Sequence, residues 1–250
     1  MTTPPSILTR PDGSIIAYAR LPGKAPGVVF LPGFHSDMTG IKAMRLEAHC
    51  RRRGQAYLRF DYQGHGRSSG RFEDGTIGGW AEDAIAVLDA LTEGAQVLVG
   101  SSMGGWLMLL AALARPERVS GLLGIASAPD FAQELLLPSL SEAALAALDS
   151  AGVWHRPSAY GADPYPITQR FLDEAATHLV LGRKLPLACP VRLLHGMADP
   201  DVPFVYSLLL ADALAAADTV VSLIKDGEHR LSRESDLERV CRTLDELLDE

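Results

Sequence analysis

Residues 97–114, VLVGSSMGGWLMLLAALA, contain no charged side chain, and their interpretation decides what the whole chain can fold into. These 18 residues are just long enough for a membrane-spanning helix. The first half, however, favours a strand and ends in Gly100-Ser101-Ser102, whereas the second half has strong helix formers and stops at Arg115-Pro116. The stretch therefore predicts a buried strand followed by a helix, with no stable insertion into a membrane.

The same alternation of strand-like and helical patterns runs through most of the chain. We expect an opening hairpin and then strands at 7–10, 14–21, 27–33, 56–61, 96–101, 119–127, 190–196 and 219–227. Helices are expected near 39–53, 76–92, 103–115, 204–217 and 232–249. This order is typical of an α/β protein with a mostly parallel central sheet and helices on both faces.

One segment interrupts the alternation. From Pro129 to Pro190 the chain holds seven of its sixteen prolines, short helical patterns and no convincing strand. We therefore predict an α/β core from residues 1–128 and 190–250, with a small helical cap inserted at 129–189. A chain of 250 residues is long enough for one such domain with a sizeable apolar interior.

Charge and cysteine content exclude several function classes. The net charge of −8 argues against a nucleic-acid groove, which needs clustered lysine and arginine. The three cysteines are far apart and form no C-x-x-C pair, so we expect neither a disulfide framework nor a metal site. The first residues contain no apolar signal segment, which favours a cytoplasmic location. No motif calls for a cofactor.

The run Gly100 to Gly104, GSSMG, matches G-x-S-x-G with Ser102 at its centre. In a nucleophile elbow this serine lies on a sharp turn from a strand to a helix, and the glycines let neighbouring backbone pass closely. The predicted strand before the motif and the predicted helix after it fit that arrangement. Ser102 is therefore the candidate nucleophile, and Ser101 is expected to be structural.

A serine nucleophile needs a base, and the base needs an acid that orients it. Asp199 follows the predicted strand 190–196, and His229 follows the predicted strand 219–227. Both lie at carboxyl ends of strands, the edge of an open α/β sheet where sites form. We therefore predict a Ser102, Asp199 and His229 triad.

Other acids and histidines are weaker candidates. Asp201 is the main rival for the acid, and Asp130 is a lesser one because it opens the insertion. His35 is expected to shape its loop or contact substrate, and His195 to bond its loop. The remaining histidines have turn, helical or cap contexts that favour structural roles: His49, His65, His155 and His178.

Acyl transfer also needs two backbone N–H groups that stabilise the developing oxyanion. Met103, directly after the serine, is expected to supply one. Phe34, in the Pro32-Gly33-Phe34 loop after the strand 27–33, is expected to supply the other. These two groups complete the predicted oxyanion hole.

Taken together, these motifs resemble the α/β-hydrolase family of serine esterases, thioesterases and peptidases. The matching runs cover nearly the whole chain in the family's order and are FLPGF, DYQGHGRS, GSSMGG, HGMADPDVP and GEHRLS. One departure is Pro32, where His-Gly is common in the family. The resemblance implies the α/β-hydrolase fold and the same triad and oxyanion positions.

Longer stretches are similar to a narrower, mitochondrial group of the family, palmitoyl-protein thioesterases also known as acyl-glucuronide esterases. They are RFDYQGHGRSSG, VGSSMGGWLMLLAALARPERV, GVWHRPSAY and CPVRLLHGMADPDVP. No transit peptide is evident, so we expect a bacterial relative. The resemblance implies hydrolysis of a carboxylic ester or thioester through an acyl-enzyme on Ser102. The substrate is expected to be a small acyl ester or thioester, or an S-acylated protein, and the assembly a monomer or homodimer.

Two alternatives stay open at this point. A peptidase or amidase uses the same triad, and a non-catalytic ligand receptor uses the same fold. In the cap, the apolar residues Leu135 to Leu137, Trp154 and Phe171 are candidates for an acyl pocket, although most leucines there fit a cap core. A leaving group with a carboxylate, such as a glucuronide, would suit four basic residues that otherwise fit a solvated surface: Arg156, Arg170, Arg183 and Lys184.

Overall fold

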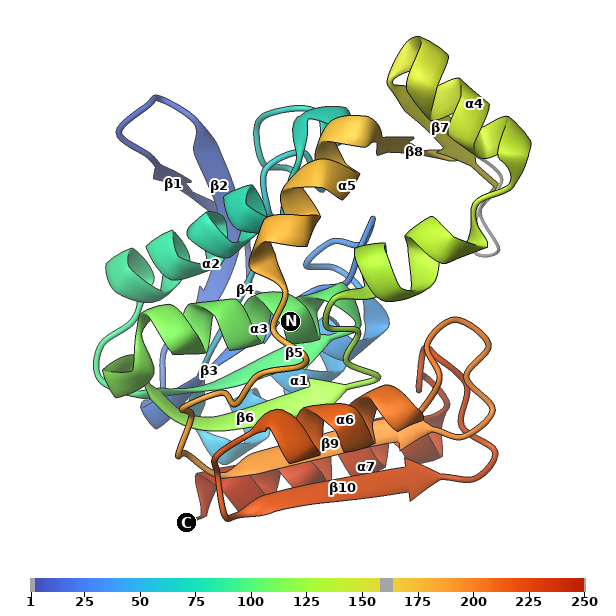
Figure 1. Cartoon of the computed structure of the whole chain (residues 1–250). Coiled ribbons are helices and arrows are strands. Elements are labelled where there is room, and N and C mark those ends of the chain that lie inside the picture. Colours follow the sequence, from blue (N-terminus) through green and yellow to red (C-terminus); the bar gives the residue numbers. More distant parts are fainter. Residues whose placement is uncertain (1–2, 158–163, 250) are drawn as a thin grey trace.

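The computed structural model describes residues 3–157 and 164–249, and its centre is an eight-stranded sheet (Figure 1). The strands are β1 (Ser6–Thr9), β2 (Ile15–Leu21), β3 (Lys24–Leu31), β4 (Gln55–Phe60), β5 (Gln96–Ser101), β6 (Val119–Ile125), β9 (Val191–Gly196) and β10 (Thr219–Ile224). Their order is β1-β2-β4-β3-β5-β6-β9-β10. β2 pairs antiparallel with both of its neighbours, β1 and β4, and all other neighbours are parallel. The predicted mostly parallel sheet is therefore confirmed.

Helices cover both faces of this sheet, as predicted (Figure 1). They are α1 (Ile41–Arg53), α2 (Ile77–Leu91), α3 (Met103–Ala114), α6 (Val205–Ala213) and α7 (Glu234–Leu248). One face packs against α1 and α7, and the other packs against α2, α3 and α6. Short helical turns join them: Phe72–Asp74, Pro116–Arg118, Ala132–Leu136, Leu137–Ser139 and Ala176–His178.

Strand β3 begins earlier than the sequence predicted, at Lys24 instead of residue 27. Lys24 donates its backbone N–H to Gly54 O at 2.8 Å, and it pairs with Gln55 of β4. The Gln55 side-chain amide also donates to the carbonyls of Lys24 and Pro26. These long-range bonds, which no local pattern records, extend the strand across Pro26.

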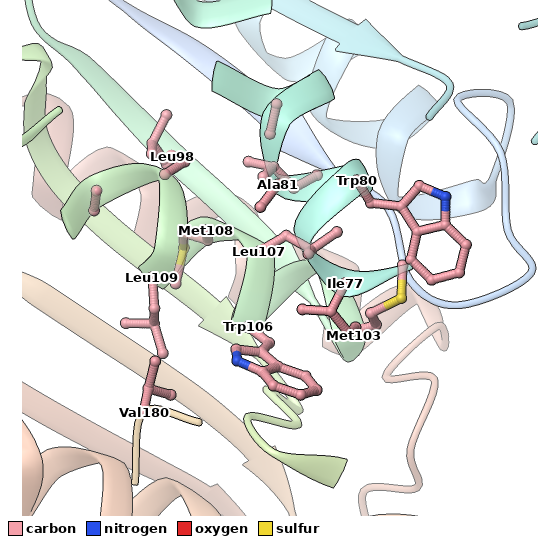
Figure 2. Close-up of a cluster of buried hydrophobic side chains, with 14 of the residues drawn as sticks. Ile77, Trp80, Ala81, Leu98, Met103, Trp106, Leu107, Met108, Leu109 and Val180 are labelled. Carbon is pink, nitrogen blue, oxygen red and sulfur yellow. The ribbon is translucent and has the colours of Figure 1, made fainter. Parts of the chain in front are cut away.

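Helix α3 lies in the centre of the larger apolar cluster (Figure 2). Four consecutive side chains on it, Trp106 to Leu109, are fully buried. Because α3 is surrounded by other elements, it has apolar residues on every face, which is also the pattern of a membrane-spanning helix. It has only 12 residues, and no helix in the described part of the chain is long and apolar enough to cross a membrane.

The predicted absence of strands between β6 and β9 is wrong. This segment contains α4 (Glu142–Ala151), β7 (Val153–Arg156), β8 (Tyr165–Thr168) and α5 (Gln169–Ala175), with β7 and β8 forming a separate antiparallel sheet. Gly152 ends α4 with φ of 71° and turns the chain into β7. Each strand has only four residues and β8 includes Pro166, so neither is long enough to show a period. Residues 158–163 of the predicted cap lie outside the described part.

A buried ion pair ties α1 to the sheet. The Glu47 carboxylate on α1 accepts from Arg59 Nε of β4 at 2.7 Å, and both side chains are almost inaccessible to solvent. Burial would raise the pKa of Glu47, but hydrogen bonds from Thr3, Arg59 and Arg51 outweigh it and lower the pKa to about 2. The ion pair therefore stabilises the fold at neutral pH.

We expect Glu47→Gln to lower the free energy of unfolding at pH 7 by about 3 kcal/mol, because Arg59 is left buried and unpaired. A carboxyl group with a lowered pKa stabilises the fold above its usual pKa of 4.5, and that contribution disappears as the pH falls towards 2. The difference from wild type should therefore shrink below pH 4.5. Urea unfolding at several pH values measures it. Glu82→Gln, at a 73% exposed position, is the control and should change little.

Candidate active site

Ser102 lies on a strained turn between β5 and α3. Its φ of 56° and ψ of −121° are unfavourable for any residue with a side chain. Its N–H donates to Ile125 O at 2.9 Å, and its carbonyl accepts from Gly105 N at 2.8 Å and Ala128 N at 3.1 Å. These three bonds hold the conformation, which raises the hydroxyl above the carboxyl edge of the sheet.

The glycines around the serine are required by close backbone contacts. A Cβ on Gly104 would lie 2.1 Å from Leu31 O, and one on Gly100 would lie 2.4 Å from Gly104 O. Both distances are far inside van der Waals contact, and both neighbours are backbone atoms that cannot move aside cheaply. The G-x-S-x-G pattern therefore reflects the packing of α3 onto the ends of β3 and β5.

The structure brings Ser102, His229 and Asp199 together. His229 Nε2 lies 3.0 Å from Ser102 Oγ, and His229 Nδ1 lies 2.8 Å from Asp199 Oδ2. The residues come from the loops after β5, β9 and β10, so the carboxyl edge of the sheet gathers them. The hydrogen bond from His229 Nδ1–H to the carboxylate leaves Nε2 free to accept the serine proton.

Asp199 is the most heavily bonded group of the site, and its side chain is fully buried. Oδ1 accepts from the N–H groups of Asp201 and Val202, both at 2.8 Å. Oδ2 accepts from His229 and lies 3.2 Å from His195 Nε2. Burial alone would raise the pKa of Asp199, but the hydrogen bonds from His195 and His229 outweigh it and hold the pKa well below its usual range. The carboxylate therefore stays ionised wherever the fold is stable.

The two predicted oxyanion donors, the N–H groups of Phe34 and Met103, belong to segments that lie beside Ser102, and their role stays a prediction. Met103 directly follows Ser102. Gly33, next to Phe34, lies close to the serine, because a Cβ on Gly33 would be 3.4 Å from Ser102 Cβ. Neither Phe34 N nor Met103 N donates to any other residue that the structure describes. Pro32, the departure from the family, has its carbonyl held by the Tyr62 hydroxyl at 3.3 Å.

The Phe34 loop is braced by the D-x-x-G-x-G-x-S run. The buried Asp61 carboxylate accepts from Met38 N at 2.7 Å and from Arg67 N at 2.9 Å. Ser68 Oγ in turn donates to Asp61 O and accepts from Ala17 N. The run is therefore a support that joins β2, the Phe34 loop and the end of β4.

The rival acids have other partners. Asp201 is exposed, and it reaches the site through its backbone N–H bond to Asp199. Asp130 is buried, and its carboxylate accepts from Val180 N at 2.9 Å and Leu181 N at 2.7 Å. Asp130 thus joins the two ends of the segment between β6 and β9.

The other histidines have structural surroundings, apart from His35 and His195. His49 pairs with Asp245, His178 pairs with Glu174, and His155 is exposed on β7. His65 is packed among the rings of Tyr62, Phe72 and Trp80, where burial lowers its pKa to about 4. His35 lines the cavity beside the serine with φ of 54°, and its ring stacks on Tyr165 at 5.5 Å.

A cavity of about 770 Å³ opens above Ser102. Its apolar wall comes from the segment after β6 and from the Phe34 loop and includes Phe34, Phe131, Leu135 and Leu136. The prediction for this wall was partly wrong: Leu137 points to solvent, while Trp154 and Phe171 pack into the core and do not line the cavity. Phe131, which no pattern marked, takes their place because it lies directly after the buried Asp130.

A second wall of the cavity is polar, and the sequence predicted only its Arg156. It includes Lys42 at the start of α1, Arg230 after the histidine, and Arg156 of β7. Burial and the nearby Arg230 charge lower the pKa of Lys42 to about 8, and its ammonium donates to the Arg230 carbonyl. Arg170, Arg183 and Lys184 do not line the cavity. Lys42 and Arg230 were not predicted, and the only sequence signal for them is that Arg230 follows His229.

Asp199, Asp201 and His229 also lie close enough to be considered as metal ligands, with one atom from each within 4.8 Å of the others. Both oxygens of Asp199 already accept hydrogen bonds, and His229 Nδ1 donates to one of them. A cation would have to break these bonds to use the cluster. The arrangement fits a hydrogen-bonded triad better than a metal site.

Known proteins share both the sequence and the fold. Residues 28–243 match the alpha/beta hydrolase family. The mitochondrial palmitoyl-protein thioesterase ABHD10 of Bos taurus is 43% identical over 98% of this chain and 80% of its own length. The structure of alpha/beta hydrolase domain-containing protein 10 from mouse has a TM-score of 0.90 at 43% identity and covers 98% of both chains. A hydrolase from Agrobacterium vitis S4 has a TM-score of 0.94 at 36% identity and covers 99% of this chain and 100% of its own.

A parallel sheet with a serine on a strand-to-helix turn at its carboxyl edge defines the class of α/β hydrolases. The chain belongs to the alpha/beta hydrolase family. It is a hydrolase of the ester and thioester type, and the predicted similarity to the palmitoyl-protein thioesterase group is confirmed. The relatives in that group are mitochondrial, so the cytoplasmic location stays a prediction, as does the oligomeric state.

Proposed function

We propose that Ser102 is the nucleophile, His229 the general base and Asp199 the residue that orients His229. Ser102 Oγ attacks the acyl carbonyl while its proton moves to His229 Nε2. The oxyanion binds the N–H groups of Phe34 and Met103, and His229 then protonates the leaving group. Water repeats the sequence on the acyl-enzyme. The continuous hydrogen-bond chain from Ser102 through His229 to Asp199 is the observation that carries this proposal.

The cavity walls suggest how a substrate lies. An acyl chain fits the apolar wall formed by Phe131, Leu135 and Leu136, and the leaving group then faces the polar wall. Residues 129–189 act as the cap that supplies the acyl side. The substrates are fatty acyl thioesters or esters, including S-acylated proteins, because the leaving group lies at the open end of the cavity.

A panel of substrates tests this assignment. Acyl thioesters and p-nitrophenyl esters of increasing chain length are compared with amides of the same acids. We expect kcat/KM to rise with chain length and amides to be turned over far more slowly. Amide turnover at rates near those of the esters would instead favour the peptidase alternative. Binding of all acyl compounds without turnover would favour the receptor alternative.

The polar wall favours acyl glucuronides as a second substrate class, because Arg156 faces the cavity and can pair with a carboxylate on the leaving group. Arg156→Gln is expected to raise KM for an acyl glucuronide about tenfold, since one charge-assisted hydrogen bond is lost. KM for a neutral ester of the same acid should be unchanged. Arg170→Gln, at an exposed position outside the cavity, is the matched control. Equal effects on both substrates would remove Arg156 from leaving-group binding.

A further inference from the structure

Two imidazole rings share one oxygen of the Asp199 carboxylate. His229 Nδ1 lies 2.8 Å from Asp199 Oδ2, and His195 Nε2 lies 3.2 Å from the same atom. His195 belongs to β9, and its side chain has no exposed surface. The Asp199 carboxylate therefore contacts a second histidine, which lies within the core.

The hydrogen-bond partners of His195 fix its tautomer. Its Nε2 lies 2.9 Å from Val202 O as well as 3.2 Å from Asp199 Oδ2, and both of these oxygens can only accept. Nε2 therefore carries the hydrogen and shares it between them. On the other side of the ring, Nδ1 accepts from the Ser207 hydroxyl at 2.7 Å. Ser207 lies on α6 and is itself buried, so the ring is held from both ends.

These contacts restrict the rotation of the Asp199 carboxylate. The N–H groups of Asp201 and Val202 hold Oδ1, but they do not fix the rotation of the carboxylate about its Cβ–Cγ bond. The position of Oδ2 therefore depends on its own donors. Without His195, only the His229 imidazole, which must exchange a proton during turnover, would bond Oδ2. The Nε2–H of the buried His195 keeps Oδ2 within hydrogen-bond distance of His229 Nδ1.

We propose that His195 is a positioning residue that acts through Asp199 and orients His229 for proton transfer. The inference rests on the triad proposed above. The order of hydrogen bonds runs from the Ser207 hydroxyl to His195, from His195 to Asp199, and from His229 to Asp199. His195 has no contact with substrate in this scheme, so it affects turnover and not binding.

Two matched substitutions separate this role from simple packing. In His195→Gln the amide nitrogen can take the place of Nε2 and still donate to Asp199, but the hydroxyl of Ser207 loses its acceptor. In His195→Asn the shorter amide can still accept from Ser207, but it cannot reach Asp199. We expect the Asn variant to lower kcat about tenfold with little change in KM, and the Gln variant to recover most of that loss.

The pH profile gives a second readout. With one donor fewer, the Asp199 charge acts more strongly on His229 and stabilises its imidazolium. The acid limb of kcat/KM should therefore move to higher pH in His195→Asn and stay near the wild-type position in His195→Gln. The other charged groups around His229 are Asp201, Lys42, Glu228 and Arg230, and they are the same in both variants.

The outcomes are distinct. If Asp199→Ala keeps wild-type turnover, the proposed triad is wrong and the role of His195 falls with it. If Asp199→Ala is inactive but His195→Asn is as active as wild type, only the inference about His195 is wrong. The same holds if His195→Asn and His195→Gln lose equal activity and neither shifts the pH profile. If His195→Asn does not fold by circular dichroism, His195→Gln decides. A kcat within about threefold of wild type with an unmoved acid limb supports the inference, and a tenfold loss of kcat in the folded Gln variant overturns it.

Discussion

Replacing Ser102 with alanine is expected to lower kcat for p-nitrophenyl acetate and acyl thioesters by a factor of about 10⁴ to 10⁶, while the fold stays intact. The hydroxyl is the only group that can form the acyl-enzyme at the apex of the turn, where His229 Nε2 lies 3.0 Å from it. Alanine at this position keeps the same backbone strain, so thermal unfolding should be almost unchanged. Steady-state kinetics and circular dichroism measure the two effects.

The neighbouring serine provides the control. Ser101 ends β5 and is buried, so Ser101→Ala should keep most of the activity. A fluorophosphonate probe should label wild type and Ser101→Ala but not Ser102→Ala, and mass spectrometry should find the label on residue 102. Turnover by Ser102→Ala, or a label on Ser101, would contradict the proposed nucleophile.

The second large effect is expected at Asp199. Asp199→Asn should lower kcat by about 10⁴, because an amide in place of the carboxylate favours the wrong tautomer of His229 and cannot stabilise the imidazolium. Asp201→Asn should change kcat by less than about threefold, because Asp201 meets Asp199 through its backbone N–H, which the substitution keeps. The pair of variants is compared in the ester assay across pH.

The same two variants decide between the rival acids. A larger loss in Asp201→Asn than in Asp199→Asn would exchange their roles. Because hydrogen bonds hold the pKa of Asp199 well below its usual range, protonation of this carboxyl should not contribute to the loss of activity in mildly acidic buffer.

Much of the core could be predicted because it depends on local patterns. The strand and helix around Ser102, the opening hairpin and the five large helices follow from periodicity and from the positions of glycine and proline. The strands β7 and β8 could not be predicted in this way. They are short and stabilise each other, and the contact between Val153 and Thr168 joins residues with no shared local signal.

The cavity was less predictable than the catalytic residues for the same reason. Leu135 and Leu136 line it while Leu137, the next residue, points to solvent. Composition cannot distinguish these three leucines, because their direction depends on how a short irregular helix packs. The same is true of the basic residues: composition does not distinguish Arg156, which faces the cavity, from Arg170, which does not.

The sequence by itself determined the class of fold, the serine at the apex of the turn and the order of the three catalytic candidates. Each of these depends on residue types at short, fixed spacings, such as glycines where a Cβ would collide with backbone. Only the tertiary structure decided which groups surround those residues. His195 meets Asp199, Asp130 joins the ends of the cap segment, and Lys42 approaches Arg230 because the parallel strands bring distant loops to one edge of the sheet.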